Sequence, residues 1–339
     1  MRWLITGGCG FIGTNLVEHL LGEGGHEIRV LDNLSTGTRE ALGRVCAFAE
    51  KDASGLVEPP PAPEGALVEL VKGDILDEPL AFSAARGRDV VVHLAASTGI
   101  EPSLRHPLED ARANVTGTLH MLEASRRAGV GRFVFASSGA AVGAREPPVH
   151  EEVAPHPASP YGAGKLAGEA YCSAYRRAYG LGTVVLRFGN VYGPRSGRKE
   201  SVVARFLRQA LSGETLHIHG DGDQTRDFIY VGDLVRALAL AASAAGVEGE
   251  TFQIGTNAET TVNSLAKTLL AALKRAGIRN VSLERAPALP GEVRRSCLDA
   301  SKAKRLLGWE AETSLAEGVE ETLTWFLSQE RPFEKPVRP

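Results

Sequence analysis

Cysteine is scarce in this chain. Only four of the 339 residues are cysteines, and no two of them form a C-x-x-C pair; they are Cys9, Cys46, Cys172 and Cys297. Neither a zinc site nor a disulfide framework is therefore predicted, because both need cysteines at close and repeated spacings. A reduced, cytoplasmic interior is the expected location.

The chain also lacks a strong charge of either sign and a long apolar run. Its 38 basic and 41 acidic residues leave a net charge of -3, which gives no reason to expect nucleic acid or an anionic membrane as partner. The longest apolar run, near residues 237–245, is too short to cross a bilayer. A strand-like Trp3-Leu4-Ile5 follows the first two residues, so no signal peptide is expected.

What is present is the composition of an ordinary globular protein, with 43% hydrophobic and 23% charged residues. A chain of this length can form two domains, or one large domain with an elaborated second lobe.

A glycine-rich turn stands near the start of the chain. Residues 2–6 read as a buried strand, Gly7-Gly8-Cys9-Gly10-Phe11-Ile12-Gly13 follows, and a helix is expected from about Thr14 to Leu21. In a strand-turn-helix unit the glycines let the backbone approach a pyrophosphate, whose charge meets the free N–H groups of the helix start. The sequence therefore predicts a dinucleotide site, with an ordinary tight turn as the alternative.

A carboxylate follows the next strand at the spacing that such a site requires. Asp32 ends the apolar run 28–31 and lies 19 residues beyond Gly13, where it can accept hydrogen bonds from a ribose diol. It would repel a 2′-phosphate, so NAD is predicted rather than NADP.

Apolar strands then alternate with helical segments. Strands are expected over 67–71, 90–94, 132–136 and 183–188, and one long helix over 107–128, whereas 46–65 reads as an irregular connection. This alternation predicts an α/β fold with a doubly wound parallel sheet, which binds ligands at the carboxyl ends of its strands. Asp74 follows one strand, where it could accept from an adenine amino group or cap a helix.

A phenol and an ammonium stand four residues apart at the start of a later helix. Ser159 can cap this helix and Pro160 can begin it, and Gly180 is a natural stop. Tyr161 and Lys165 then share one helix face, where a nearby cation would lower the pKa of the phenol. On these residues alone, a solvated helix carrying an accidental pair is an equal alternative.

The strict alternation weakens after Arg195. We expect a dinucleotide-binding domain over 1–189, with later segments near 226–256 able to pack back on it, a ligand-binding lobe over 190–329, and a tail over 330–339. Ser138 lies at the end of a predicted sheet strand, where its hydroxyl could bond both a substrate oxygen and the Tyr161 phenol; a Ser-Gly turn is the alternative.

Taken in order, these motifs carry a family resemblance. The chain resembles the extended short-chain dehydrogenase/reductase superfamily, in particular its nucleotide-sugar epimerases, and looks most like the UDP-glucose 4-epimerase group. The match runs from the first strand to about Phe326 and rests on motifs including the glycine turn, Asp32-Asn33-Leu34-Ser35-Thr36-Gly37, Asn114-Val115-Thr116-Gly117-Thr118, Tyr161 with Lys165, and Gly222-Asp223-Gln224-Thr225-Arg226-Asp227.

The resemblance implies a Rossmann-type fold, a tightly held NAD, and interconversion of UDP-hexoses at C4 through a 4-keto intermediate. It makes Tyr161 the acid and base, with Lys165 and Ser138 as its catalytic partners. It places at the cofactor Gly7, Gly10, Phe11, Ile12, Gly13, Asp32, Asn33, Ser35, Thr36, Gly37, Asp74, Ile75, Leu94, Ala95, Ala96, Asn114, Ala136, Tyr161, Lys165 and Phe188. It places at the substrate Ser138, Tyr161, Asn190, Val203, Phe206, His217, His219 and Arg226.

Three positions depart from the family pattern. Val142 stands where relatives often have a tyrosine, Leu289 where they have an arginine on the diphosphate, and Thr98 where some direct a lysine at the cofactor phosphate. Arg294 or Arg195 could supply the charge that is missing at Leu289.

Two other functions stay open beside the epimerase. A nucleotide-sugar 4,6-dehydratase or decarboxylase would place an acid directly after the serine, where this chain has Gly139-Ala140-Ala141. A catalytically silent NAD-binding regulator would lose the tyrosine and lysine. The helices over 107–128 and 161–179 correspond to those at a four-helix interface in relatives, so a homodimer is expected.

Overall fold

A parallel sheet of eight strands organises the molecule. The computed structural model describes residues 1–51, 68–288 and 293–329. The strands lie in the order β12-β7-β6-β5-β1-β2-β4-β3, and every neighbouring pair is parallel. Their bounds are β1 Arg2–Thr6, β2 Glu27–Asp32, β3 Ala49–Lys51, β4 Val68–Lys72, β5 Val90–His93, β6 Arg132–Ser138, β7 Gly182–Phe188 and β12 Thr251–Ile254.

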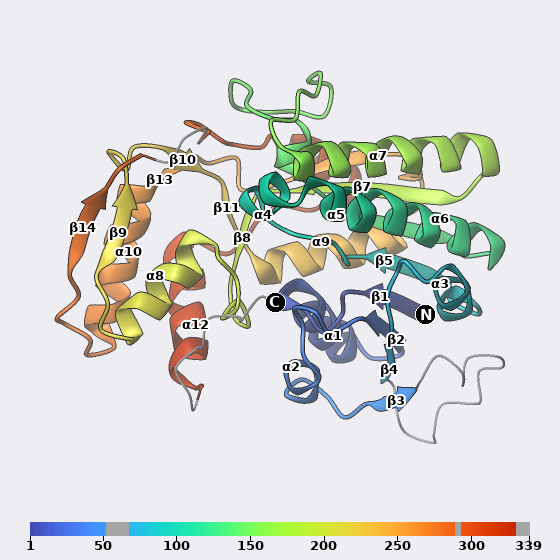
Figure 1. Cartoon of the computed structure of the whole chain (residues 1–339), viewed down its shortest axis with the longest axis horizontal. Helices are drawn as coiled ribbons and strands as arrows, with labels where there is room; N and C mark the ends of the chain where they lie inside the picture. The colour runs from blue at the N-terminus through green and yellow to red at the C-terminus, as the bar shows by residue number, and fades with distance from the viewer. Residues whose placement is uncertain (52–67, 289–292, 330–339) are drawn as a thin grey trace.

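Helices cover both faces of this sheet (Figure 1). One face packs against α3 (Glu78–Ala85), α6 (Gly117–Arg127) and α7 (Pro160–Tyr179), and the other against α1 (Phe11–Glu23) and α9 (Val231–Ser243). Two apolar cores result, because the buried strands carry hydrophobic side chains toward both faces. The predicted doubly wound α/β fold is confirmed, and β1 has the expected bounds.

The structure corrects three local expectations. The helix expected over 107–128 is interrupted: α5 (Pro107–Ala111) leads into a π-helical turn, η2 (Arg112–Thr116), before α6 begins. A helix that the pattern did not show, α4 (Ile100–Arg105), precedes it. The connection over 46–65 is not irregular throughout, because β3 pairs with β4; its residues 52–65 lie outside the described part of the chain.

A smaller lobe forms around a third apolar core. Figure 1 shows it at one end of the molecule, where α8, α10 and α12 lie with the pair β9 and β14. Its elements are β8 Asn190–Tyr192, α8 Val202–Leu211, β9 Leu216–His219, β10 Thr225–Arg226, β11 Phe228–Tyr230, β13 Thr260–Thr261, α10 Val262–Arg275, β14 Leu283–Ala286 and α12 Leu315–Leu327. The tail over 330–339 lies outside the described residues.

The chain crosses between the two parts more than once. After β9 it returns to the sheet through α9 and β12, and β12 pairs along β7 from Thr251↔Val185 to Ile254↔Phe188. α11 (Ser301–Leu307) then packs beside β12 before the chain goes back to the lobe. The segments that connect the sheet to the lobe are therefore held by the pairing of β12 with β7 and by the packing of α11 beside β12. In the described residues, we find no helix that is long and apolar enough to cross a membrane.

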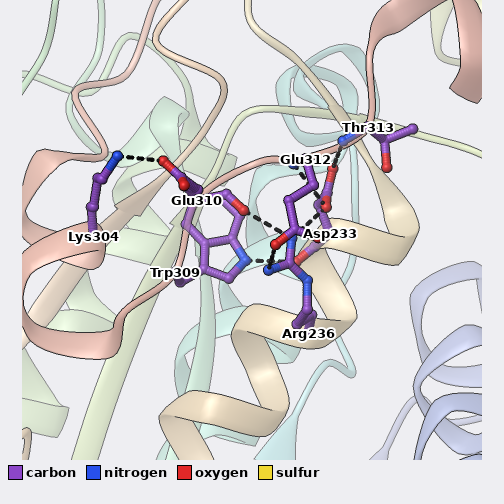
Figure 2. A network of polar contacts seen from close by, with 7 residues as sticks. All are labelled: Asp233, Arg236, Lys304, Trp309, Glu310, Glu312 and Thr313. Carbon is purple, nitrogen blue, oxygen red and sulfur yellow. Dashed lines mark hydrogen bonds and ion pairs between the residues drawn. The ribbon is translucent and has the colours of Figure 1, made fainter.

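The buried carboxylate of Asp233 holds the segment by which the chain goes from α11 back to the lobe (Figure 2). Asp233 on α9 is 3% exposed, and its two oxygens accept from the backbone N–H groups of Glu312 and Thr313 and from the Arg236 guanidinium at 2.6 Å. The indole N–H of Trp309 donates to the Asp233 carbonyl at 2.9 Å. One residue thus holds the segment that leads into α12.

Asp233→Ala should lower the free energy of unfolding by about 3 kcal/mol, because it leaves two N–H groups without their acceptor and the half-buried Arg236 guanidinium without its closest one. Urea denaturation measures the change. The matched control is Glu312→Gln, which removes only the exposed partner of Arg236 and should cost less than about 0.5 kcal/mol. Equal costs for the two variants would contradict the assigned role of Asp233.

Candidate active site at the carboxyl ends of the strands

The glycine turn after β1 is built for close approach of the backbone. Gly7 has φ +70°, and a Cβ on it would meet the Ala95 nitrogen at 2.9 Å. A Cβ on Gly13 would lie 2.4 Å from the Gly7 carbonyl oxygen, so α1 starts against the turn itself. The N-cap of α1, Gly10, offers no side-chain acceptor, which leaves the first N–H groups of the helix, from Phe11 and Ile12, for a ligand.

Asp32 lies at the end of β2 and holds this turn. One carboxylate oxygen accepts from the Cys9 N–H at 2.9 Å and the other from the Leu34 N–H at 2.8 Å. Burial raises the pKa of Asp32, and these two hydrogen bonds lower it in part. Each oxygen keeps a further lone pair, as a ribose diol would need.

The loop after β2 closes over the turn. A Cβ on Gly37 would meet the Cys9 carbonyl carbon at 2.5 Å, so the loop and the turn are in contact. Asn33 bridges to the next strand, because its side-chain amide donates to Asp74 at 2.9 Å. Ser35 and Thr36 are exposed on this loop. The predicted ribose and adenine residues are thus neighbours, as the cofactor would require.

The loop after β5 forms the opposite wall. Asn114, in the π-helical turn, clamps it by accepting from the Ser97 N–H at 3.0 Å and donating to the Ser97 carbonyl at 2.9 Å. Thr6 accepts from the Ala95 N–H and shares a hydrogen bond with His93 at 2.7 Å. Burial and the charge of Lys165 lower the His93 pKa to about 3, so this histidine is neutral. The other predicted neighbours are Ile75 and Phe188, both buried, and Leu94 and Ala96, both half-buried.

Tyr161 and Ser138 face each other beside this wall. Ser159 caps α7 by accepting from the Gly162 N–H at 3.1 Å, and this fixes Tyr161 in the first turn. Ser138 ends β6, and its side chain is close enough to Tyr161 to lower the pKa of the phenol. The two residues predicted to act in catalysis are therefore neighbours.

Lys165 is buried under the same helix turn. Its side chain is 4% exposed, and its ammonium donates to the Ala136 carbonyl on β6 at 2.8 Å. The ammonium lies 5.0 Å from the centroid of the Phe135 ring and 5.9 Å from that of Tyr161. Burial lowers the pKa of Lys165 to about 8.

This arrangement corrects the expectation for the phenol. Instead of a lowered value, burial raises the pKa of Tyr161 to about 12, and this outweighs the lowering effect of the Ser138 side chain. The physical reason is that the Lys165 ammonium is bonded to the Ala136 carbonyl instead of the phenol oxygen. Without a cofactor, the phenol is therefore a weaker acid than in water, and less of it is present as the phenolate base at neutral pH.

Two buried groups near Lys165 were not singled out from the sequence. Asp110 on α5 is 1% exposed, neither of its carboxylate oxygens has a hydrogen-bond partner within the described ranges, and its charge raises the pKa of both Tyr161 and Lys165. Glu169 accepts from Arg187 at 2.6 Å and from Ser137, the residue before Ser138. Asp110 lies four residues before Asn114 and Glu169 four residues after Lys165, and only this helical spacing could have pointed to them in the sequence.

The predicted diphosphate residues are partly committed elsewhere. Asn190 is exposed at the start of β8, and its N–H donates to the Asp227 carbonyl at 2.7 Å. The Arg226 guanidinium donates to the Val293 carbonyl at 2.7 Å. Arg195 is paired with Glu18 on α1, and Arg294 with Asp221. The departure at Leu289 lies outside the described residues.

The four predicted uridine residues divide into two pairs. Val203 and Phe206 on α8 are each 1% exposed and belong to the apolar core of the smaller lobe, so only their main chain is left for a ligand. His217 and His219 alternate with the buried Leu216 and Ile218 on β9 and share the other face of that strand. The His219 ring forms a hydrogen bond with the Pro287 carbonyl at 3.1 Å.

The raised pKa of Tyr161 makes a spectroscopic prediction. In cofactor-free protein the phenol should stay protonated beyond about pH 10, where an ordinary tyrosine is half ionised, and cationic nicotinamide should bring the ionisation to lower pH. The near-ultraviolet phenolate absorbance of the wild type minus that of Tyr161→Phe measures it, with the exposed Tyr179→Phe as control. Ionisation at or below pH 10 without cofactor would contradict the structure.

Known proteins with the same architecture support the cofactor site. A UDP-glucose 4-epimerase of Mycolicibacterium smegmatis is 39% identical, covering 96% of this chain and 98% of that protein. The structure of a UDP-glucose 4-epimerase from Thermotoga maritima with UDP-glucose has a TM-score of 0.84 and 38% identity, covering 96% of this chain and 99% of that one. That of a Thermus thermophilus UDP-glucose 4-epimerase in complex with NAD has a TM-score of 0.82 and 36% identity, covering 97% and 99%.

The model of the NAD dependent epimerase/dehydratase family matches residues 3–255, which include the glycine turn, Asp32, Ser138, Tyr161 and Lys165. The predicted Rossmann-type fold, the NAD cofactor and the class of enzyme, an NAD-dependent nucleotide-sugar epimerase, are confirmed by these matches. The chain belongs to the NAD dependent epimerase/dehydratase family.

Proposed function

We propose that this enzyme interconverts UDP-hexoses at C4 through a 4-keto sugar, with Tyr161 as the acid and base. One observation carries the proposal: Tyr161 and Ser138 lie close together at the carboxyl end of β6, next to the buried Lys165. Relatives that act on UDP-glucose and share more than a third of their residues with the chain support the choice of substrate.

The residues divide the chemistry among them. Tyr161 takes the proton from the sugar O4 and later returns it, and Ser138 holds that oxygen in line with the phenol. The glycine turn and Asp32 would hold NAD, which when bound would supply the reversible hydride acceptor for C4. Lys165 keeps positive charge close to the phenol and would be the residue that holds the cofactor ribose there.

Electrostatics favours a phenol that ionises only in the loaded site. In the cofactor-free site, desolvation and the unpaired Asp110 both raise the Tyr161 pKa. A cationic ring bound beside Tyr161 acts in the opposite direction, and each unit of lowering needs about 1.4 kcal/mol of interaction. Tyr161 would thus become a base only when the hydride acceptor is in place.

The wall next to Ser138 supports epimerisation over dehydration. The short turn η3 (Gly139–Ala141) follows Ser138 and carries no acidic side chain, and Val142 behind it is 1% exposed. A 4,6-dehydratase needs a second acid and base for the elimination step. Small residues here also leave room for a keto sugar to present its opposite face.

The proposed activity has a direct test. Incubation with UDP-glucose, UDP-N-acetylglucosamine and UDP-glucuronate, followed by separation of C4 epimers, should show interconversion of at least one pair. Tyr161→Phe should lower turnover by about a thousandfold while retaining NAD, because the phenol oxygen is the only group lost. The idea fails if the NAD-loaded protein epimerises none of the three, or if Tyr161→Phe keeps full activity.

The homodimer stays a prediction, and the exposed apolar side chains of α4, α5 and α7 support it. These three helices lie beside one another (Figure 1). Among their large apolar residues, Leu108 is 85% exposed and Leu104 60%, and Ile100, Tyr171 and Tyr179 are exposed as well. An exposed apolar surface on adjacent helices is typical of an interface between subunits. We infer a two-fold interface in which these helices pack against their copies.

Leu108→Asp should therefore raise the dimer dissociation constant by a factor of ten or more, because it places a charge in an apolar interface. Size-exclusion chromatography with light scattering, over a range of protein concentrations, measures it. Leu306→Asp on α11 is the matched control, since Leu306 is 43% exposed on a different helix. A monomeric wild type, or a Leu108→Asp variant that dimerises like the control, would rule the interface out.

The cytoplasm is the proposed location, supported by four cysteines that are all free in the structure. The division into domains over 1–189 and 190–329 also stays a proposal, qualified by the pairing of β12 with β7.

A further inference from the structure

The loop after β8 lies against two segments of the predicted cofactor site, the start of α1 and the loop after β2. The Asn15 side chain on α1 donates to the Pro194 carbonyl at 3.2 Å, and the Arg195 guanidinium donates to the Asn15 side chain at 2.9 Å. Arg198 donates to the carbonyl of Thr36 at 3.4 Å. This loop, residues 193–200, is therefore tied to the start of α1 and to the loop after β2.

Lys199 is held firmly in this loop. Its N–H donates to the Ser196 carbonyl at 2.8 Å, and its carbonyl accepts from Arg208 on α8 at 2.6 Å. Its ammonium lies 5.5 Å from the centroid of the Phe11 ring, at the first residue of α1. The side chain thus extends from a fixed backbone to the glycine turn.

The ammonium has no anion beside it. Across residues 1–51, 68–288 and 293–329, neither a hydrogen-bond acceptor nor a carboxylate contacts it, although Arg195 is paired with Glu18 and Arg208 with Glu200. Burial lowers the pKa of Lys199, and no charge compensates. Lys199 is half-buried. A cation that is partly withdrawn from water without a partner is costly, so its place is best explained by an anionic ligand.

We propose that Lys199 binds the diphosphate of NAD, together with the uncapped N–H groups at the start of α1. Phe11, whose ring lies near the Lys199 ammonium, is also the first residue of α1. The ammonium and the positive end of the helix are therefore close to each other, where both can attract the same anion. This assignment explains how the chain manages with Thr98 in place of a phosphate-directed lysine.

The inference rests on the bound NAD of the family and not on the proposed epimerisation, so a binding assay separates the two. Isothermal titration calorimetry on protein freed of cofactor would compare the wild type with Lys199→Met and Lys199→Arg. Methionine keeps the apolar stem over Phe11 and removes the charge, and arginine keeps the charge. The ligands are NAD, ADP-ribose, adenosine, and UDP added to NAD-saturated protein.

If Lys199 binds the cofactor diphosphate, Lys199→Met should raise the dissociation constants of NAD and ADP-ribose about tenfold or more. The dissociation constant of adenosine should not change, because adenosine has no phosphate. Lys199→Arg should keep most of the affinity. The melting temperature of cofactor-free Lys199→Met should equal or exceed that of the wild type, since an unpaired half-buried charge is removed.

Three outcomes would overturn the proposal. NAD affinity within about twofold of the wild type would mean that Lys199 does not meet the diphosphate. An equal loss for adenosine, or a lower melting temperature without ligand, would mean that the lysine only supports the fold. A loss confined to UDP would assign it to the diphosphate of the nucleotide sugar instead.

Discussion

The burial of charge without a matching partner is the constraint on which this site depends. Lys165 and Asp110 are buried at the carboxyl edge of the sheet and Lys199 is half-buried there, and none of the three forms an ion pair within the described residues. By contrast, the Arg187–Glu169 pair under β6 and the Arg29–Glu69 pair between β2 and β4 are complete. Charges that serve structure are neutralised inside the chain, whereas those that face the ligand site are left for the ligand.

The fold follows from local patterns, and the sequence predicted it well. Apolar strands alternate with helices along the first half of the chain, and each signal lies within a few residues. Glycine turns, helix caps and strand runs report the backbone directly, so the glycine turn, the Ser159 cap and Asp32 all lie where they were expected. The π-helical turn was not visible, because its residues have the composition of an ordinary helix.

The site was less predictable because its electrostatics comes from contacts far apart in the sequence. The spacing of Tyr161 and Lys165 places both on one helix face, but it does not show that the ammonium bonds to Ala136, 29 residues away. The pairing of Arg195 with Glu18 spans 177 residues and removes the cation that the pattern offered for a diphosphate. Lys199 carries no motif, and only the folded chain brings it to Phe11.

The place of β12 at the edge of the sheet bears on how the protein can be divided. All seven residues of β7 are buried, and β12, which comes after the first part of the smaller lobe, covers its outer edge. A fragment that ended at residue 189 would expose that strand as an unpaired apolar edge, a template for aggregation. The nucleotide-binding half is thus completed by chain that is made later, and the two halves are expected to fold as one unit.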